Sequence, residues 1–277
     1  MPDAAPFDGL SGKVAIVTGA GRKRSIGRPI AVALAREGCD VVLTGTGRRP
    51  EAYPDDEKQS GWRDIDSVAE EVRALGRRAV PLVSDVRDAG AIDRLIERCL
   101  SELGHIDILI NNAGAARGAD RVPVVELDEA IWRNVIDTNL TGTFLMSRAV
   151  ARQQIKQGTG GRIVNISSIA GKLHGPSTAA YAASKAGIQS LTASMAAELA
   201  RYQVTVNAVL PGTIDTFRLD DLGRGEEWER RVKQRIPLGR AGTGEDIAEM
   251  TAFLCSPRAN WITGQSHIVD GGTVRQG

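Results

Sequence analysis

Seven short apolar runs, rich in β-branched residues, recur along the chain and alternate with longer helix-like segments. Each run is continuously apolar, which is typical of strands buried on both faces of a parallel sheet. Alternating strands and helices require right-handed crossovers, so the pattern predicts a Rossmann-type doubly wound α/β fold. We expect a seven-stranded, mostly parallel sheet with helices on both faces. The predicted strands are 14–18, 40–45, 79–84, 106–110, 162–167, 204–210 and 266–270.

The segments between these runs contain helix signals but no linker, so residues 1–277 are expected to form one domain. Three helix-like segments end in glycines suited to a left-handed C-cap, Gly38, Gly76 and Gly104. Two long stretches, 46–63 and 212–240, show no regular pattern. Loops of this length in a compact domain are more often functional than accidental. The second follows the sixth predicted strand, where it is expected to cover a ligand as a substrate-binding lid.

Composition excludes several classes of protein. The chain is 42% hydrophobic and 25% charged, with a net charge of +1, so no overall field favours nucleic acid or an anionic membrane. The start, MPDAAPFDGL, resembles no signal peptide, and no apolar run approaches the roughly 20 residues that span a bilayer. The cysteines show no metal-ligand spacing, so we expect no metal. A cytoplasmic enzyme or binding protein is the expectation.

A glycine-rich stretch, TGAGRKRSIG at 18–27, follows the first predicted strand. In a parallel sheet, the first strand-to-helix turn usually receives a pyrophosphate, and glycines let it approach the backbone at the helix N-terminus. Gly19, Gly21 and Gly27 suit this role, and the helix is expected to begin near Ser25 or Ile26. The simple G-x-G-x-x-G pattern fails because Arg24 occupies the place of its third glycine.

Further motifs follow in a fixed order along the chain. They are NNAG at 111–114, Asn139 in TNLTG, Ser168 in NISSIAG, Tyr181 and Lys185 in YAASK, PG at 211–212 and ITGQSHIVDGG at 262–272. Together they resemble the short-chain dehydrogenase/reductase family, from about residue 13 to residue 272. The family's loop usually reads T-G-x-x-x-G-x-G. Here it is two residues longer, with Ser25 at a usual glycine, so we interpret it as a modified nucleotide loop.

The resemblance implies a dinucleotide site along the carboxyl ends of the strands. Asp85 and Val86 match a position that contacts adenine, although Asp85 is equally suited to capping the following helix. Small residues after the fourth strand would pass beneath a ribose. The full set of expected cofactor-binding residues is Gly19, Gly21, Arg22, Lys23, Arg24, Ser25, Ile26, Gly27, Arg48, Arg49, Asp85, Val86, Asn111, Ala113, Gly114, Tyr181, Lys185, Pro211, Gly212 and Ile214.

The residues around the adenosine ribose predict the dinucleotide. An acidic residue at the end of the second strand would bind the 2′-OH of NAD and repel the 2′-phosphate of NADP, and Gly45 occupies that position. Arg48 and Arg49 follow it, and Arg22 to Arg24 lie on the neighbouring loop. The cations favour NADP over NAD, which stays an alternative. The other interpretation is a solvated basic face.

Tyr181 and Lys185 are four residues apart and therefore share one face of a helix. A nearby ammonium favours the phenolate, so Tyr181 can act as general acid in reduction and general base in oxidation. By resemblance, Lys185 also holds the nicotinamide ribose. Ser168 would donate a hydrogen bond to the substrate oxygen; Ser167 is the alternative, but the family's spacing matches Ser168. By resemblance, Asn139 holds a proton-relay water, and its alternative role is at a helix bend or cap.

These residues predict an NADP(H)-preferring oxidoreductase that interconverts a ketone or aldehyde and an alcohol. Alternatives are a 3-oxoacyl thioester reductase, an NAD-dependent secondary alcohol dehydrogenase, and a non-catalytic dinucleotide sensor or scaffold. Because all four catalytic residues are present, an enzyme is favoured; a nucleic-acid binder is not. By resemblance we also expect a homotetramer, or else a homodimer. Its interfaces would involve 127–157, 181–201 and the segment after Gly264.

Overall fold

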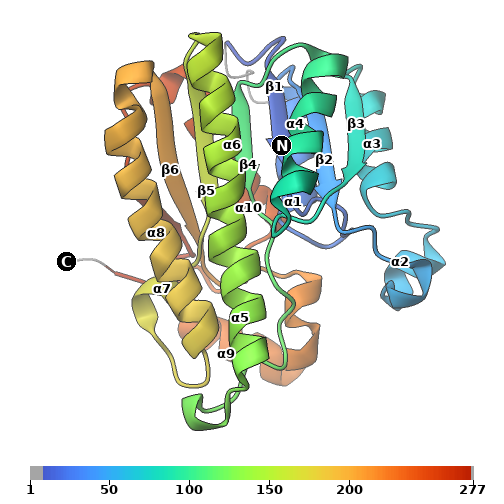
Figure 1. Cartoon of the computed structure of the whole chain (residues 1–277). Coiled ribbons are helices and arrows are strands. Elements are labelled where there is room, and N and C mark those ends of the chain that lie inside the picture. The colour runs from blue at the N-terminus through green and yellow to red at the C-terminus, as the bar shows by residue number, and fades with distance from the viewer. Residues whose placement is uncertain (1–8, 276–277) are drawn as a thin grey trace.

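A seven-stranded sheet forms the centre of the computed structural model, which describes residues 9–275 (Figure 1). Its strand order is β3-β2-β1-β4-β5-β6-β7, and every neighbouring pair is parallel. The Rossmann-type fold is thus confirmed, and the sheet is parallel throughout. The strands are β1 (Val14–Val17), β2 (Asp40–Gly45), β3 (Ala79–Val83), β4 (Ile108–Asn111), β5 (Gly161–Ile166), β6 (Val204–Pro211) and β7 (Ser266–Val269).

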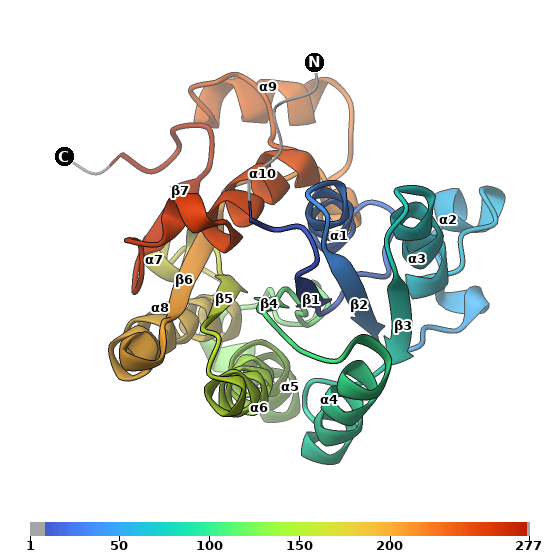
Figure 2. The same cartoon turned by 90° about the horizontal axis from the view of Figure 1, so that it is seen from above.

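Helices cover both faces of the sheet, as Figure 2 shows from above. One layer contains α1 (Gly27–Arg36), α3 (Ile65–Ala74) and α10 (Gly244–Cys255), and the other contains α4 (Ala89–Leu103), α6 (Gly142–Gln157) and α8 (Ala179–Leu199). Successive strand side chains point to opposite faces. Ala15 and Val17 of β1 therefore join one buried cluster, and Val14 and Ile16 join the other. Two apolar cores thus sandwich the sheet.

Short helices occupy both stretches that were expected to be irregular. Residues 46–63 contain η1 (Pro50–Ala52) and α2 (Asp55–Gln59), and 212–240 contains η5 (Phe217–Leu222) and α9 (Glu226–Arg235). The expectation was wrong because these helices bury few residues; Val232 alone is buried in α9, so no apolar period marks it. The other short elements are η2 (Val124–Glu126), α5 (Glu129–Ile136), η3 (Asp137–Thr141), α7 (Ala170–Leu173), η4 (Ala200–Tyr202) and η6 (Pro257–Ala259).

Backbone geometry agrees with the expected helix ends. Gly38, Gly76 and Gly104 all have positive φ, of 97°, 76° and 88°. Glycine adopts this conformation without the steric cost that a Cβ atom adds. In the described part of the chain, no helix has the length and apolar character needed to cross a membrane.

The winding of the chain places a crevice at one end of the sheet. From β1 the strand order runs outward through β2 and β3 on one side and through β4 to β7 on the other. The loops after β1 and β4 therefore diverge where the winding reverses, which is where open parallel sheets bind ligands. Figure 1 shows α5, α7 and α9 gathered at the end of the sheet where the strands terminate.

Candidate active site

A cleft of about 790 Å³ lies along the carboxyl ends of β1, β4, β5 and β6. It brings together most residues that the sequence predicts for cofactor binding and catalysis, although they come from loops far apart in the chain. The predicted residues that line it are Gly19, Gly21, Arg22, Arg24, Ser25, Ile26, Arg48, Asp85, Val86, Ala113, Gly114, Ser168, Tyr181, Lys185, Pro211, Gly212 and Ile214. The predicted residues that do not line it are Lys23, Gly27, Arg49, Asn111 and Asn139.

Asn111 belongs to the polar interior beside the cleft. Its side-chain Nδ2 donates to Ser147 Oγ and Asn165 Oδ1, both at 2.8 Å. The next residue, Asn112, lines the cleft instead, and its Nδ2 donates to the carbonyl oxygens of Thr18 and Gly19 at 2.9 and 3.0 Å. Asn112 is not among the residues that the sequence predicts for the site. It ties the loop after β4 to the loop after β1.

Two glycines of the TGAGRKRSIG loop are required by close contacts. Gly19 has φ +66°, and a Cβ there would lie 2.7 Å from Ala113 Cα. At Gly21, a Cβ would lie 1.6 Å from Oδ1 of Asp64, a residue of the cleft wall. Both contacts are far shorter than packed atoms allow. Glycine at these two positions thus lets the backbone pass close to its neighbours.

Ser25 forms two hydrogen bonds within the longer loop. Its Oγ donates to the carbonyl oxygen of Arg22 at 2.8 Å and accepts from the backbone N–H of Arg28 at 3.2 Å. The hydroxyl thus closes the turn and satisfies one free N–H in the first turn of α1. A serine at the usual glycine position therefore serves the geometry of the extended loop.

Carboxylates already bind two of the predicted basic residues. Arg48 Nη1 lies 2.8 Å from Glu57 Oε2, and its Nη2 lies 3.0 Å from Asp64 Oδ1. Arg24 forms ion pairs with Asp56 and Asp220. The carboxylates on Arg48 come from the stretch after β2 and are nearly buried, yet no local pattern marked them in the sequence.

Arg22 differs from these two residues. Its Cζ lies 4.2 Å from the centroid of the Phe217 ring, and its Nη1 is buried with no hydrogen-bond partner. Burial and the nearby charge of Arg48 hold the pKa of the Arg22 guanidinium below its usual value. Arg22 therefore lines the cleft with a guanidinium whose Nη1 lacks a hydrogen-bond partner.

Helix α8 positions Tyr181 and Lys185 on one face, as their spacing predicts. Lys185 Nζ lies 5.7 Å from the Tyr181 ring centroid and donates to the carbonyl oxygen of Ile166 at 2.8 Å. Burial opposes ionisation of the Tyr181 phenol, but Lys185, Arg218 and a hydrogen bond with Ser168 outweigh it, so the Tyr181 pKa falls below 10. Burial also lowers the pKa of Lys185. The phenol is thus suited to proton exchange.

The two serines after β5 have different partners. Ser167 Oγ donates to the backbone carbonyl oxygen of Lys185 at 2.8 Å, which uses its proton. Ser168 Oγ accepts from the N–H of Ala170 at 3.1 Å and shares a hydrogen bond with Tyr181. The geometry therefore favours Ser168 as the serine that faces the reacting groups.

Asn139 lies beneath the cleft in the π-helical turn η3, between α5 and α6. It is fully buried; its Oδ1 accepts from the N–H of Ala115 at 2.8 Å, and its Nδ2 donates to Ser184 Oγ at 2.9 Å. π-Turns inside helices frequently occur at functional sites. Here the side chain connects the loop after β4 with α8, the helix that contains Tyr181.

Asp85 lines the cleft, and another residue caps the following helix. The Asp85 carboxylate accepts from the backbone N–H of Arg87 at 2.9 Å and pairs with its guanidinium. This guanidinium holds the Asp85 pKa below its usual value. The N-cap of α4 is Asp88, which accepts from the N–H of Ala91 at 3.1 Å. The capping role considered for Asp85 is therefore wrong.

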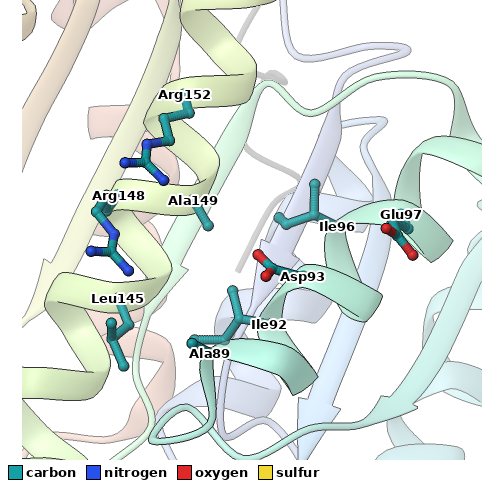
Figure 3. Close-up of a pocket in the computed structure, with 9 residues that line it drawn as sticks. All are labelled: Ala89, Ile92, Asp93, Ile96, Glu97, Leu145, Arg148, Ala149 and Arg152. Carbon is teal, nitrogen blue, oxygen red and sulfur yellow. The ribbon is translucent and has the colours of Figure 1, made fainter.

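A smaller hollow of about 290 Å³ lies between α4 and α6 (Figure 3). Apolar side chains such as Ile92, Ile96 and Leu145 line it, with Arg148 and Arg152 along α6. None of the residues predicted for catalysis or cofactor binding borders it. The larger cleft is therefore the candidate active site.

Comparisons with known proteins agree with this geometry. The family model described as Enoyl-(Acyl carrier protein) reductase matches residues 19–274. The chain is 36% identical to the 2-dehydro-3-deoxy-D-gluconate 5-dehydrogenase of Escherichia coli K12, over 95% of this chain and 96% of the relative. It is 39% identical to the 3-oxoacyl-[acyl-carrier-protein] reductase FabG of Staphylococcus aureus Mu50, over 94% and 97% of the two chains.

A solved structure is similar to this chain over nearly its whole length. A short-chain type dehydrogenase/reductase from Mycobacterium marinum superposes with a TM-score of 0.82 at 31% identity, covering 96% of this chain and 97% of that one. The relatives named above are dehydrogenases and reductases, so an enzyme is favoured over a non-catalytic sensor. The chain belongs to the short-chain dehydrogenase/reductase family and is an NAD(P)-dependent oxidoreductase that interconverts carbonyl and alcohol groups.

Proposed function

We propose that Tyr181 exchanges the proton, and Ser168 binds the reacting oxygen, in reversible hydride transfer between a nicotinamide and a ketone, aldehyde or alcohol. The single observation that supports this most is that Tyr181 lines the cleft together with Ser168 and Lys185, whose Nζ lies 5.7 Å from the Tyr181 ring centroid. These neighbours lower the pKa of the phenol. When bound, the nicotinamide cofactor supplies or accepts the hydride. The chain's own residues orient the substrate and move the proton.

In reduction, Ser168 donates a hydrogen bond to the carbonyl oxygen as negative charge develops on it. Tyr181 gives its proton to the same oxygen and becomes a phenolate. The ammonium of Lys185, 5.7 Å from the ring centroid, stabilises that phenolate. In oxidation the phenolate accepts the alcohol proton. For Asn139, which the resemblance assigns to a proton-relay water, we propose a positioning role instead, because its side chain contacts Ala115 and Ser184 and does not line the cleft.

The cleft suits a dinucleotide. Gly19 and Gly21 leave the backbone uncovered where α1 begins, and the N-terminus of α1 favours phosphate. Asp85, Val86, Pro211, Gly212 and Ile214 line the same cleft. In this proposal the first two contact the adenine, and the other three form the wall near the nicotinamide. These positions are proposals for the residues that would hold NAD(P).

For the phosphate on the ribose, we retain NADP(H) as the proposed preference, and its support is Arg22. The Nη1 of Arg22 is buried without a partner in the cleft wall. Arg49 gives no support because it does not line the cleft, and Arg48 is bound by carboxylates. Asp64 favours the second candidate, NAD(H), because a carboxylate in the cleft wall accepts from a ribose 2′-OH and repels a phosphate.

The relatives suggest two substrate types. One is a ketone on a sugar acid, as in the name of the Escherichia coli enzyme, and the other is a 3-oxoacyl thioester, as in the name of the Staphylococcus aureus enzyme. A simple secondary alcohol is the third type. The choice depends on the segment 212–240, which we propose as the lid, and on the loop after β4.

We also propose a homotetramer, with a homodimer as the alternative, in the cytoplasm. Two exposed apolar regions support assembly. Trp132 and Phe144, on α5 and α6, are 36% and 41% exposed, and Trp261, which precedes the edge strand β7, is 100% exposed. Exposed aromatic side chains of this kind are frequent at interfaces. Light scattering after gel filtration would give the oligomeric state.

The first experiment is a direct titration of the purified protein with NADPH and NADH, followed by nicotinamide absorbance assays on ketones and secondary alcohols. Binding with turnover is the expected result. The role of Tyr181 is supported if Tyr181→Phe binds the nucleotide but does not turn over, while the unchanged enzyme does both. Failure of both nucleotides to bind would overturn the proposal.

A further inference from the structure

Three arginine side chains meet at the catalytic end of the cleft. The Cζ atom of Arg121 lies 4.5 Å from the Tyr181 ring centroid, and that of Arg218 lies 4.8 Å from it. Arg117 lines the same cleft. Arg121 and Arg218 help Lys185 to lower the Tyr181 pKa, but no step of the proposed proton exchange needs three guanidiniums at this place.

The three arginines come from two segments that meet over Tyr181. Arg117 and Arg121 lie in the loop after β4, and Arg218 lies in η5 of the lid. Arg218 Nη1 donates to the carbonyl oxygen of Ala115 at 2.5 Å, and Arg117 forms an ion pair with Asp221. These contacts hold the lid against the loop, with guanidiniums from both segments in the cleft.

Carboxylates compensate this positive charge only in part. Arg117 is paired with Asp221, while Arg121 is 3.5 Å from Asp120 and its buried Nε has no hydrogen-bond partner. Among residues 9–275, Arg218 has no ion-pair partner. Burial and the neighbouring Arg218 hold the Arg121 pKa below its usual value. A buried charge that lacks a full partner is unfavourable unless a ligand supplies one.

We propose that the substrate carries a carboxylate within a few bonds of the carbon that exchanges the hydride, and that Arg121 and Arg218 bind it. The cofactor's phosphates have their own place at the N-terminus of α1, so an anion beside Tyr181 belongs to the substrate. Planar guanidinium groups match the two oxygens of a carboxylate. This inference rests on the proposed function and narrows its substrate to oxo acids and hydroxy acids.

Both arginines also lower the Tyr181 pKa, and this effect must be separated from substrate binding. Comparing each acid with its own methyl ester does so. An effect on the phenol changes kcat/KM for acid and ester alike, whereas loss of a carboxylate contact changes the acid alone. The ratio of the two kcat/KM values therefore reports the contact.

The test uses pairs of 2-oxo, 3-oxo and 4-oxo carboxylates and aldonates with their methyl esters or amides, and dihydroxyacetone phosphate for phosphate. We expect the acid to exceed its ester in kcat/KM, and Arg218→Met and Arg121→Met to reduce that ratio by about ten- to a hundredfold, mainly through KM. Arg218→Lys keeps the charge and should restore part of the ratio. Arg230→Met is the control, because Arg230 is exposed on α9 and does not line the cleft.

Calorimetry of carboxylate and amide binding to the cofactor-loaded enzyme supplies a readout that needs no turnover. Turnover of esters at least as fast as acids, with ratios unchanged in both variants, overturns the carboxylate site and leaves the oxidoreductase function intact. Arginine-dependent carboxylate binding without hydride transfer supports the anion site and contradicts the function proposed for it. A marked preference for the phosphate compound, or no carboxylate binding at all, also overturns the inference.

Discussion

The Nη2 atom of Arg48 lies 3.0 Å from Oδ1 of Asp64, and the two side chains are only 14% and 8% exposed. The cation that the sequence assigns to a 2′-phosphate is therefore held by a carboxylate at the same end of the cleft. A Cβ atom at Gly21 would lie 1.6 Å from Asp64 Oδ1, and one at Gly45 would lie 3.7 Å from Asp64 Oδ2. Thus the end of β2, where the sequence has Gly45 in place of an acidic residue, has the carboxylate of Asp64 beside it.

This ion pair predicts how the dinucleotide preference responds to substitution. Asp64→Asn removes the charge that repels a 2′-phosphate and frees one side of Arg48, so the ratio of Kd values should shift toward NADPH by about tenfold or more. Fluorescence titration with both nucleotides measures it. Arg49→Ala should leave the ratio unchanged, because Arg49 lies outside the cleft lining. An unaltered ratio in Asp64→Asn would remove Asp64 from the ribose site.

Tyr181→Phe should abolish nearly all turnover while nucleotide binding persists. The substitution removes one hydroxyl, and loss of a general acid or base costs about 10²- to 10⁴-fold in rate. Steady-state assays measure kcat and a titration measures the nucleotide Kd, so the effects on turnover and on binding are separated. Tyr202→Phe is the matched control, since Tyr202 packs against the core and does not line the cleft. Retained activity in Tyr181→Phe would contradict the proton-exchange role.

The lowered pKa of Tyr181 predicts opposite pH profiles for the two directions. Oxidation needs the phenolate, so its kcat/KM should rise with pH and level off above a pKa that is below 10. Reduction needs the phenol, so its kcat/KM should fall as pH rises through the same value. Lys185→Met removes a charge that stabilises the phenolate, so the pH dependence of kcat/KM should shift to higher pH in both directions of the reaction.

The control for the pH profile is Lys156→Met, which removes an exposed lysine of α6. This variant should not shift the pH profile of kcat/KM in either direction. If Lys185→Met left both profiles unchanged as well, the group that titrates would have to be one other than Tyr181. Profiles of kcat/KM for one alcohol and its ketone provide the comparison.

Asn139→Ala should destabilise the fold as well as reduce activity. The buried amide satisfies the N–H of Ala115 and the hydroxyl of Ser184, so its removal leaves unsatisfied groups, at a cost of about 1–3 kcal/mol. Denaturant unfolding measures this loss. Asn260→Ala is a suitable comparison, since Asn260 is exposed and pairs with Arg162 at the surface. Equal stability of the two variants would argue against a structural role for Asn139.

Predictions that depend on the spacing of residues close together in the sequence agree with the structure. Continuous apolar runs indicated strands buried on both faces, and all seven are present in a parallel sheet. The spacing of Tyr181 and Lys185 placed them on one face of a helix, because four residues make about one turn. In TGAGRKRSIG, the glycines indicated close backbone approach, and Gly19 and Gly21 require it. These features depend on residues near one another in the sequence.

Only the tertiary structure decided which side chains surround the two ends of the cleft. Asp64 reaches Arg48 and Gly21 through the packing of an inserted segment, and Arg121 and Arg218 meet at Tyr181 although they are far apart along the chain. No sequence motif and no regular spacing marks either of these two groups of residues. The physical reason is that strand and helix patterns repeat with the backbone's own geometry, whereas contacts between loops depend on how the complete sheet positions their ends.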